Sequence, residues 1–192
     1  NYRTGAGIIR RLRDGIKTSS EMGGWFDYRD IYDLLAQGLK DGDAFVEVGT
    51  WKGQSISYLA QRIQDINKTV SISCVDTFLG DEGTGAMDVF DECVGNLDDS
   101  ETIGMINVIQ RDSVEAAVNF KDAHFAAIFL DAAHDYDSVM ADIEAWKPKI
   151  KKGGIFAGHD ADAPDVKRAL VDSGIEYGKI GRCWIMKPKE VK

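Results

Sequence analysis

The stretch FVEVGTWKGQS, residues 45–55, decides the fold of this chain. It joins a short apolar strand, expected at 44–48, to a segment in which Ile56, Leu59, Ala60 and Ile63 recur at helical spacing. Glycines in a strand-to-helix turn let the backbone approach a ligand closely, and the free N–H groups of the following helix face that ligand. The alternative is a tight turn that binds nothing. Neither GxxxxGK[ST] nor GxGxxG is present, and Trp51 would crowd a pyrophosphate, so we expect a ligand without one.

Strand and helix patterns alternate outward from this turn. Such alternation predicts a parallel sheet with helices on both sides. The last two strands flank Gly181-Arg182, a two-residue turn typical of an antiparallel hairpin. We therefore predict an α/β fold with a doubly wound, mostly parallel seven-stranded sheet and a C-terminal antiparallel hairpin. The expected strands are 44–48, 70–75, 105–109, 124–130, 155–158, 176–180 and 183–187, and the expected helices are 27–39, 56–63, 86–97, 113–119, 139–146 and 164–172.

The size and charge of the chain exclude several classes of protein. Its 192 residues suit one main domain, which we place at 25–192 behind an N-terminal arm at 1–24. A net charge of −9 argues against a nucleic-acid partner. No apolar run approaches the roughly 20 residues of a membrane span, and no secretory signal is seen. The cysteines Cys74, Cys93 and Cys183 are odd in number and scattered, so we expect reduced thiols and a cytoplasmic protein.

The first 20 residues are basic, with four arginines and one lysine against Asp14. Within them Ile8, Ile9, Leu12 and Ile16 fall at helical spacing and predict a short amphipathic helix. We interpret it as a packing or homodimer arm, with a site for an anionic group as the alternative.

Ligands of parallel sheets bind at the carboxyl ends of the strands, so polar residues just after each strand are the candidate site residues. Asp76 ends the second strand and can accept hydrogen bonds from both hydroxyls of a ribose; capping a helix is its alternative role. After the third strand, Asp112 can accept from an exocyclic amine such as that of adenine. Ser113 is expected to cap the helix that follows.

Two histidines and two aspartates follow the fourth and fifth strands: Asp131, His134, His159 and Asp160. Adjacent strand ends bring them to one rim, where they can hold a divalent cation. His134 can instead take a proton from a substrate hydroxyl. Taken singly, each histidine is equally consistent with a polar loop residue. His124 starts a strand on the opposite rim, and we expect it to be structural.

These residues resemble the class I S-adenosylmethionine-dependent methyltransferases, over residues 25–188. FVEVGTWKGQS is similar to the first motif of that family, with Glu47, Gly49 and Gly53 at matching positions and Trp51 where the middle glycine usually stands. VDTF is similar to the second motif and RDS to the segment beside adenine. The resemblance implies S-adenosylmethionine as cofactor, with Glu47, Gly49 and Gly53 framing its methionine end and Phe78 near adenine. The full implied contact set is Glu47, Gly49, Thr50, Trp51, Gly53, Ser55, Asp76, Thr77, Phe78, Asp112, Ser113 and Asp131.

Residues 130–160, LDAAHDYDSVMADIEAWKPKIKKGGIFAGHD, resemble the small macrocin-type O-methyltransferases. That resemblance implies Mg²⁺ held by Asp131, His159 and Asp160, with His159 where an Asp often stands. Ala133 replaces the acidic residue that serves as candidate base in the subgroup. We therefore assign catalysis to His134 with Asp131.

The implied reaction is O-methylation of a small-molecule hydroxyl on a sugar or a catechol-like diol. The acceptor is expected to enter over 20–30 and 79–104, with Met22–Phe26 as a lid. Two other functions remain open: a cofactor-binding module without catalysis, and an NAD-dependent oxidoreductase.

Overall fold

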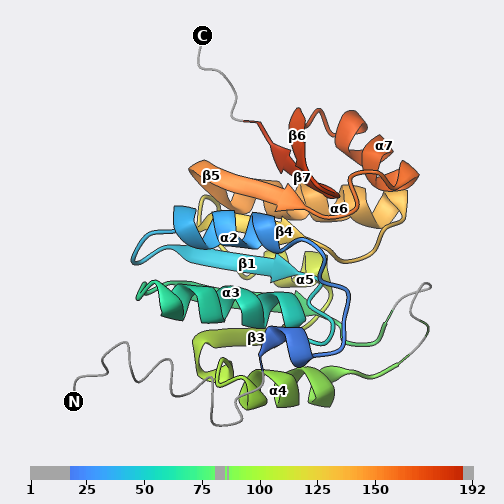
Figure 1. Ribbon diagram of the computed structural model, residues 1–192. Helices are drawn as coiled ribbons and strands as arrows, with labels where there is room; N and C mark the ends of the chain where they lie inside the picture. The colour runs from blue at the N-terminus through green and yellow to red at the C-terminus, as the bar shows by residue number, and fades with distance from the viewer. Residues whose placement is uncertain (1–17, 81–84, 86, 188–192) are drawn as a thin grey trace.

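The computed structural model describes residues 18–80, 85 and 87–187, which form one seven-stranded sheet between two layers of helices (Figure 1). The strand order is β3-β2-β1-β4-β5-β7-β6, and β7 runs antiparallel to both of its neighbours. The predicted fold class is thereby confirmed. The strands are β1 Ala44–Val48, β2 Ser71–Asp76, β3 Ile106–Gln110, β4 Phe125–Leu130, β5 Ile150–Gly158, β6 Tyr177–Ile180 and β7 Cys183–Met186. The helices are α2 Arg29–Gly38, α3 Gln54–Asp65, α4 Phe90–Asp99, α5 Ser113–Ala117, α6 Tyr136–Trp146 and α7 Pro164–Asp172, with 3-10 turns η1 Ser19–Glu21, η2 Ile103–Met105 and η3 Lys147–Lys149.

The two helical layers bury opposite faces of the sheet. α2, α3 and α4 pack on one face in a core that includes Phe45 and Phe129, whereas α5, α6 and α7 pack on the other with Val46 and Phe156. Strand side chains alternate between faces, so neighbouring residues of β1 belong to different cores. Glu47 therefore points toward the α2–α3 layer, between Val46 and Val48 of the opposite core. This orientation decides its role in the site.

β5 begins at Ile150, five residues earlier than the sequence predicts. Gly153 and Gly154 lie inside this strand, at an irregularity in its pairing with β4. A Cβ on Gly154 would lie 2.8 Å from the carbonyl oxygen of Ala126, and Gly153 has a φ of +77°. Glycines thus serve a β-bulge here instead of a break.

The C-terminal hairpin forms as predicted, with Gly181 at a φ of +56° in its turn. β7, its antiparallel strand, pairs with β5 and lies one position inside the sheet edge, while β6 forms the edge. β7 approaches β5 closely: a Cβ on Gly158 would lie 2.6 Å from the Trp184 ring and 2.5 Å from the carbonyl oxygen of Leu130.

Three further expectations from the sequence concern the N-terminal segment, the cysteines and membrane-spanning helices. The basic amphipathic helix expected around residues 8–16 lies outside the described residues. The thiols of Cys74, Cys93 and Cys183 are free and buried, as predicted. In the part of the chain that the structure describes, none of the helices has the length and apolar character needed to cross a bilayer.

The contact between Gly158 and Trp184 generates a stability prediction. Gly158→Ala should lower the free energy of unfolding by about 1–3 kcal/mol, because a methyl group there overpacks the β4–β5–β7 contact. Gly178→Ala in β6 is the matched control, since a Cβ there meets nothing within 4 Å. Urea denaturation measures both variants; equal stabilities would contradict this packing.

Candidate active site

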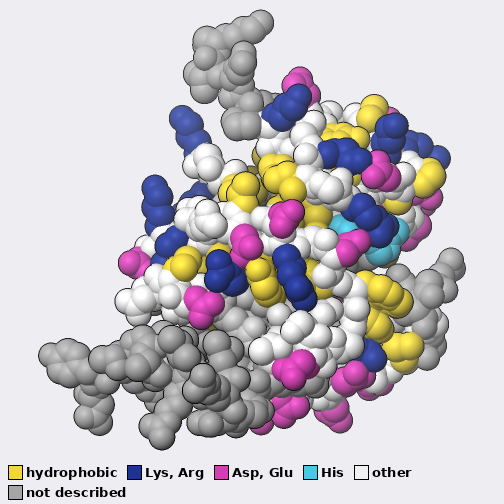
Figure 2. All heavy atoms as spheres, in the orientation of Figure 1, with side chains coloured by type: hydrophobic (Ala, Val, Ile, Leu, Met, Phe, Trp, Pro, Cys, Tyr) yellow, Lys and Arg dark blue, Asp and Glu magenta, His cyan; other side chains and the backbone are white. Residues whose placement is uncertain are grey.

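A single cleft of about 890 Å³ lies at the carboxyl ends of the parallel strands. The histidine atoms visible in Figure 2 lie at the side of the molecule toward which the parallel strand arrows of Figure 1 point. The cleft is lined by twelve of the candidate residues: Gly49, Thr50, Trp51, Ser55, Asp76, Thr77, Asp112, Ser113, Asp131, His134, His159 and Asp160. The strand ends therefore bring the two predicted groups of residues into one cavity.

The turn after β1 depends on a glycine. Gly49 has a φ of +86°, and a Cβ there would lie 2.1 Å from the carbonyl oxygen of Asp131. A side chain at this position would thus collide with the strand end of β4, while glycine also adopts the positive φ without strain. Trp51 lies in the same left-handed region, with a φ of +47°.

Asp76 binds the turn after β1 through its carboxylate. Oδ2 accepts hydrogen bonds from the backbone N–H groups of Thr50 (2.8 Å) and Trp51 (2.7 Å), and Oδ1 accepts from that of Phe78 (2.7 Å). A carboxylate has about four acceptor positions, so roughly one remains for a ligand. In this arrangement Asp76 can accept from one ribose hydroxyl, whereas the sequence expectation was both.

Glu47 does not line the cleft, so the structure corrects its expected contact with the methionine end of the cofactor. Its carboxyl group is buried beneath the turn, where it accepts hydrogen bonds from the hydroxyls of Tyr32 and Thr50. Burial raises the pKa of Glu47 to about 7, against the opposing effect of hydrogen bonds from Ser55, Thr50 and Tyr32. Glu47 therefore supports the turn from below.

Gly53 and Phe78 also lie outside the cleft. Gly53 precedes the first turn of α3 with a φ of +83°, and a Cβ there would contact Cys93 of α4 at 3.1 Å. Phe78 is fully buried and packs edge to face on Phe90. The expected contact of Phe78 with adenine is therefore corrected: its ring belongs to the core.

The segment after β3 corrects one expected role. Asp112, not Ser113, caps α5, because its Oδ1 accepts from the backbone N–H groups of Val114 and Glu115. The Ser113 hydroxyl instead donates to Asp142 and accepts from the Trp146 indole N–H at 2.8 Å. Burial raises the pKa of Asp142 to about 6, which the Ser113 hydrogen bond opposes.

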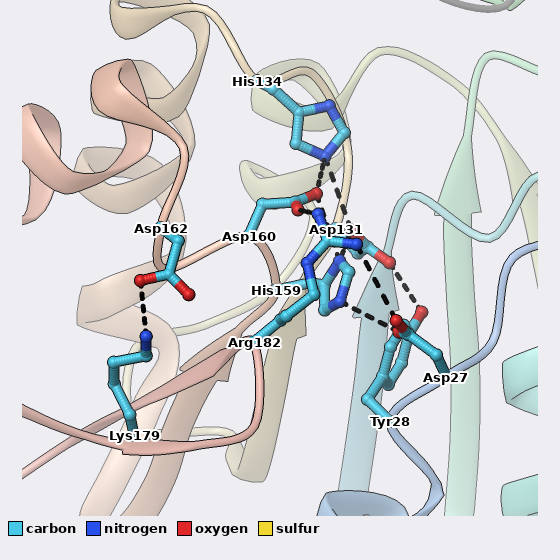
Figure 3. A network of polar contacts seen from close by, with 9 residues as sticks. All are labelled: Asp27, Tyr28, Asp131, His134, His159, Asp160, Asp162, Lys179 and Arg182. Atoms are coloured by element: carbon cyan, nitrogen blue, oxygen red, sulfur yellow. Dashed lines mark hydrogen bonds and ion pairs between the residues drawn. The ribbon is translucent and has the colours of Figure 1, made fainter.

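Asp131, His134, His159 and Asp160 form one polar cluster at the ends of β4 and β5 (Figure 3). His134 Nε2 lies 2.9 Å from Asp160 Oδ2 and 3.6 Å from Asp131 Oδ1. His159 Nδ1 lies 3.1 Å and 3.5 Å from the same two oxygens. Both imidazoles thus face both carboxylates.

Three residues outside the predicted set complete the cluster. The Tyr28 hydroxyl donates to Asp131 Oδ2 at 2.6 Å, and Arg182 from the β6–β7 turn donates to Asp160 Oδ1. Asp27 lies 3.3 Å from His159 Nε2 and 3.7 Å from Arg182. Asp27 and Tyr28 fall in the segment predicted to border the acceptor, but nothing in the sequence pairs them with a strand end. Sequence reasoning could identify Arg182 as a site residue only if the edge hairpin were known to fold back toward β5.

Mutual ion pairing sets the protonation of this cluster. Hydrogen bonds from His134 and His159 lower the pKa of Asp160 far below its usual range. Contacts with Asp131 and Asp160 raise the pKa of His134 to about 10. Burial opposes ionisation of His159, but the same carboxylates outweigh it and raise its pKa to about 9. Near pH 7 both imidazoles are therefore protonated and both carboxylates ionised.

This donor set does not fit Mg²⁺. The ligand atoms of Asp131, His134 and Asp160 lie within 4.8 Å of one another, but one of them is an imidazole nitrogen, and Mg²⁺ prefers oxygen. Moreover, each of the four carboxylate oxygens already lies against a donor of His134, His159, Tyr28 or Arg182. The reaction proposed below therefore does not use the Mg²⁺ that the family resemblance implies.

Comparisons with known proteins agree with this geometry. A family model described as "Methyltransferase domain" matches residues 46–161, more than half of the chain. Uncharacterized protein y4gI of Sinorhizobium fredii is 24% identical over 119 residues, which are 61% of this chain and 13% of that protein, so the match spans only a small part of its length.

Two solved structures illustrate the likeness in fold. The O-methyltransferase NovP has a TM-score of 0.63 at 13% identity, over 83% of this chain and 78% of NovP. CalS11, the TDP-rhamnose 3′-O-methyltransferase of calicheamicin biosynthesis, has a TM-score of 0.60 at 16% identity, over 99% of this chain and 89% of CalS11. At these identities the likeness bears on the fold alone.

The buried carboxyl of Glu47 generates a prediction about pH. Its pKa rises from 4.5 in the unfolded chain to about 7 in the folded one, so the folded state binds the proton more tightly. Glu47 should therefore cost stability on the order of 3 kcal/mol as the pH rises from about 4.5 to 7. Glu47→Gln stays neutral and should lose that part of the pH dependence in urea unfolding series. Glu115→Gln, on the exposed side of α5, is the control; identical pH profiles for Glu47→Gln and the unmodified protein would refute the assignment.

Proposed function

This chain belongs to the methyltransferase-domain family, with the fold of the class I S-adenosylmethionine-dependent enzymes, and from that premise we propose that it methylates a hydroxyl group of a small molecule. One observation carries the proposal: a single cleft joins the turn after β1 and Asp76 to the Asp131–His134–Asp160 cluster. Its volume of about 890 Å³ is within the range of small-ligand sites.

In this proposal the cofactor lies across the ends of β1, β2 and β3. Gly49 lets the turn after β1 pack directly against the end of β4, and Asp76 accepts from one ribose hydroxyl. Asp112 lines the same cleft; its Oδ1 caps α5, and we assign its second oxygen to the adenine amine. S-adenosylmethionine supplies an electrophilic methyl group, and the residues of this chain position what attacks it.

The acceptor hydroxyl is placed at the Asp131–His134–Asp160 cluster. Its oxygen forms a bond to the methyl carbon, the carbon–sulfur bond breaks with its electron pair on sulfur, and the oxygen loses its proton. His134 is already protonated near pH 7, so we propose that a carboxylate of Asp131 or Asp160 takes the proton instead. Because pairing makes these carboxylates weak bases, the proton leaves only as the oxygen–methyl bond forms and the oxygen becomes strongly acidic. His134 then holds the acceptor oxygen by hydrogen bonding. Alignment of two such reactants contributes about 7 kcal/mol or more to lowering a barrier.

The cofactor assignment predicts a binding defect in Asp76→Asn. S-adenosylhomocysteine should bind at least about tenfold more weakly, because hydrogen bonds to a charged group contribute about 1.5–3 kcal/mol. Isothermal titration calorimetry measures the affinity. Asp41→Asn is the matched control: Asp41 also accepts a backbone N–H, that of Thr69, but at the opposite edge of the sheet. An unchanged affinity in Asp76→Asn would remove Asp76 from the cofactor site.

The acceptor assignment predicts a catalytic defect in His134→Gln. Turnover on a responsive hydroxyl compound should fall about 10–100-fold because a charge-assisted hydrogen bond to the acceptor is lost, while S-adenosylhomocysteine affinity stays within about twofold. His124→Gln, on the opposite rim, should retain full turnover. Cofactor binding without transfer to any hydroxyl compound in a panel of sugars and diols would favour the alternative of a non-catalytic module.

A further inference from the structure

Two tryptophans stack beside the proposed cofactor turn. The rings of Trp25 and Trp51 lie 4.6 Å apart between centroids and only 7° from parallel. Both line the cleft, together with Gly23 and Gly24. Trp25 is 72% exposed, a rare exposure for so large an apolar side chain. The stack therefore presents an apolar surface at the cleft that no described residue covers.

Only Trp25 offers a free ring face in this stack. Trp25 covers one face of Trp51, and the Lys52 ammonium lies over the same ring, 4.8 Å from its centroid. Since the stacked indole occupies the first face, Lys52 covers the second. Lys52 is itself held by Glu92 of α4 at 3.0 Å. Trp51 is thus fixed on both sides and supports Trp25, whose outer face remains open.

The backbone of Trp51 adopts a conformation that is less favourable for tryptophan than for glycine. A φ of +47° is unfavourable for a non-glycine residue by about 1–3 kcal/mol, whereas glycine adopts it freely. The N–H group that binds Asp76 would be present with any residue except proline. The Nε1 of Trp51 is buried and has no hydrogen-bond partner among the described residues.

The segment that carries Trp25 connects the stack to the polar cluster. Tyr28, three residues after Trp25, donates to Asp131, and Asp27 contacts His159 and Arg182. A chain rises by at most about 3.6 Å per residue, so the Cα atoms of Trp25 and Tyr28 lie within about 11 Å of each other. One short segment therefore carries both the exposed ring and a direct contact to the cluster.

We propose that the acceptor is a hydroxylated aromatic ring, which stacks on the outer face of Trp25 and directs its hydroxyl to the Asp131–His134–Asp160 cluster. The inference rests on the proposed methyl transfer and selects among its acceptors. Aromatic rings prefer parallel-offset contacts of the kind already present between Trp25 and Trp51. A sugar depends on several side-chain hydrogen-bonding groups, and the residues next to Trp25 in the chain, Gly23, Gly24 and Phe26, carry none.

The test uses two probes that share a diol and differ in aromaticity: catechol and cis-cyclohexane-1,2-diol. Ligand-observed NMR titrations of the full chain, saturated with S-adenosylhomocysteine, give both affinities. Catechol should bind about two- to tenfold more tightly than the cyclic diol, and Trp25→Ala should remove that preference. Trp25→Phe keeps an aromatic face and should retain it. Val171→Ala, an exposed apolar residue of α7 away from the cleft, is the control and should behave as the unmodified protein.

Trp51 is tested as a positioning residue in the same assay. Trp51→Gly should reduce the catechol preference, and Trp51→Phe should restore most of it, which general loss of folding cannot explain. Equal binding of the two probes, or an unchanged preference in Trp25→Ala, would overturn the aromatic acceptor while leaving methyl transfer intact. Failure of the unmodified protein to bind S-adenosylhomocysteine would overturn the proposed function itself, and with it this inference.

Discussion

The three backbone hydrogen bonds accepted by Asp76 are the constraint on which the cofactor half of the cleft depends. One carboxylate at the end of β2 gathers the N–H groups of Thr50 and Trp51, from the turn after β1, and that of Phe78, from its own loop. Unpaired backbone N–H groups are costly to bury. The Asp76 carboxylate therefore both supplies the hydrogen-bond acceptor for these N–H groups and fixes the shape of the turn. Gly49 completes the shape, because only a residue without Cβ fits against the β4 end. Glu47 stabilises the same turn from its buried side.

The half of the cleft at the ends of β4 and β5, where we propose that the acceptor binds, is organised by charge balance. Asp27, Asp131 and Asp160 face His134, His159 and Arg182, so the cations of the chain itself match its anions. Buried charges are tolerated only when they are paired and hydrogen-bonded. This pairing explains the raised histidine pKa values, and it places a donor of the chain itself beside each carboxylate oxygen of Asp131 and Asp160. A cluster that neutralises itself also lets a neutral hydroxyl approach without a large change in local field.

The sequence predicted the order of elements well because strand and helix periodicities are local properties. It placed β5 too late because Gly153 and Gly154 are typical of a break, and only the pairing with β4 shows them to be a bulge. It placed Glu47 and Phe78 in the ligand site because motif position does not tell which way a side chain points. Glu47 lies on the α2–α3 side of its strand, and Phe78 turns into the core at a positive φ. The residues added by the structure, Tyr28 and Arg182, reach the site through tertiary contacts more than 20 residues from their partners in sequence.

The position of Arg182 has a consequence for how such a protein diversifies. This guanidinium sits on a two-residue turn at the end of the sheet farthest from β2 and β3. Lengthening or shortening that turn would change the shape of one wall of the proposed acceptor pocket. The ends of β1 and β2, where we place the cofactor, would stay unchanged. Acceptor specificity can therefore change in evolution without a change in cofactor binding. A laboratory library of variants confined to this hairpin would sample new acceptors while the cofactor site stays intact.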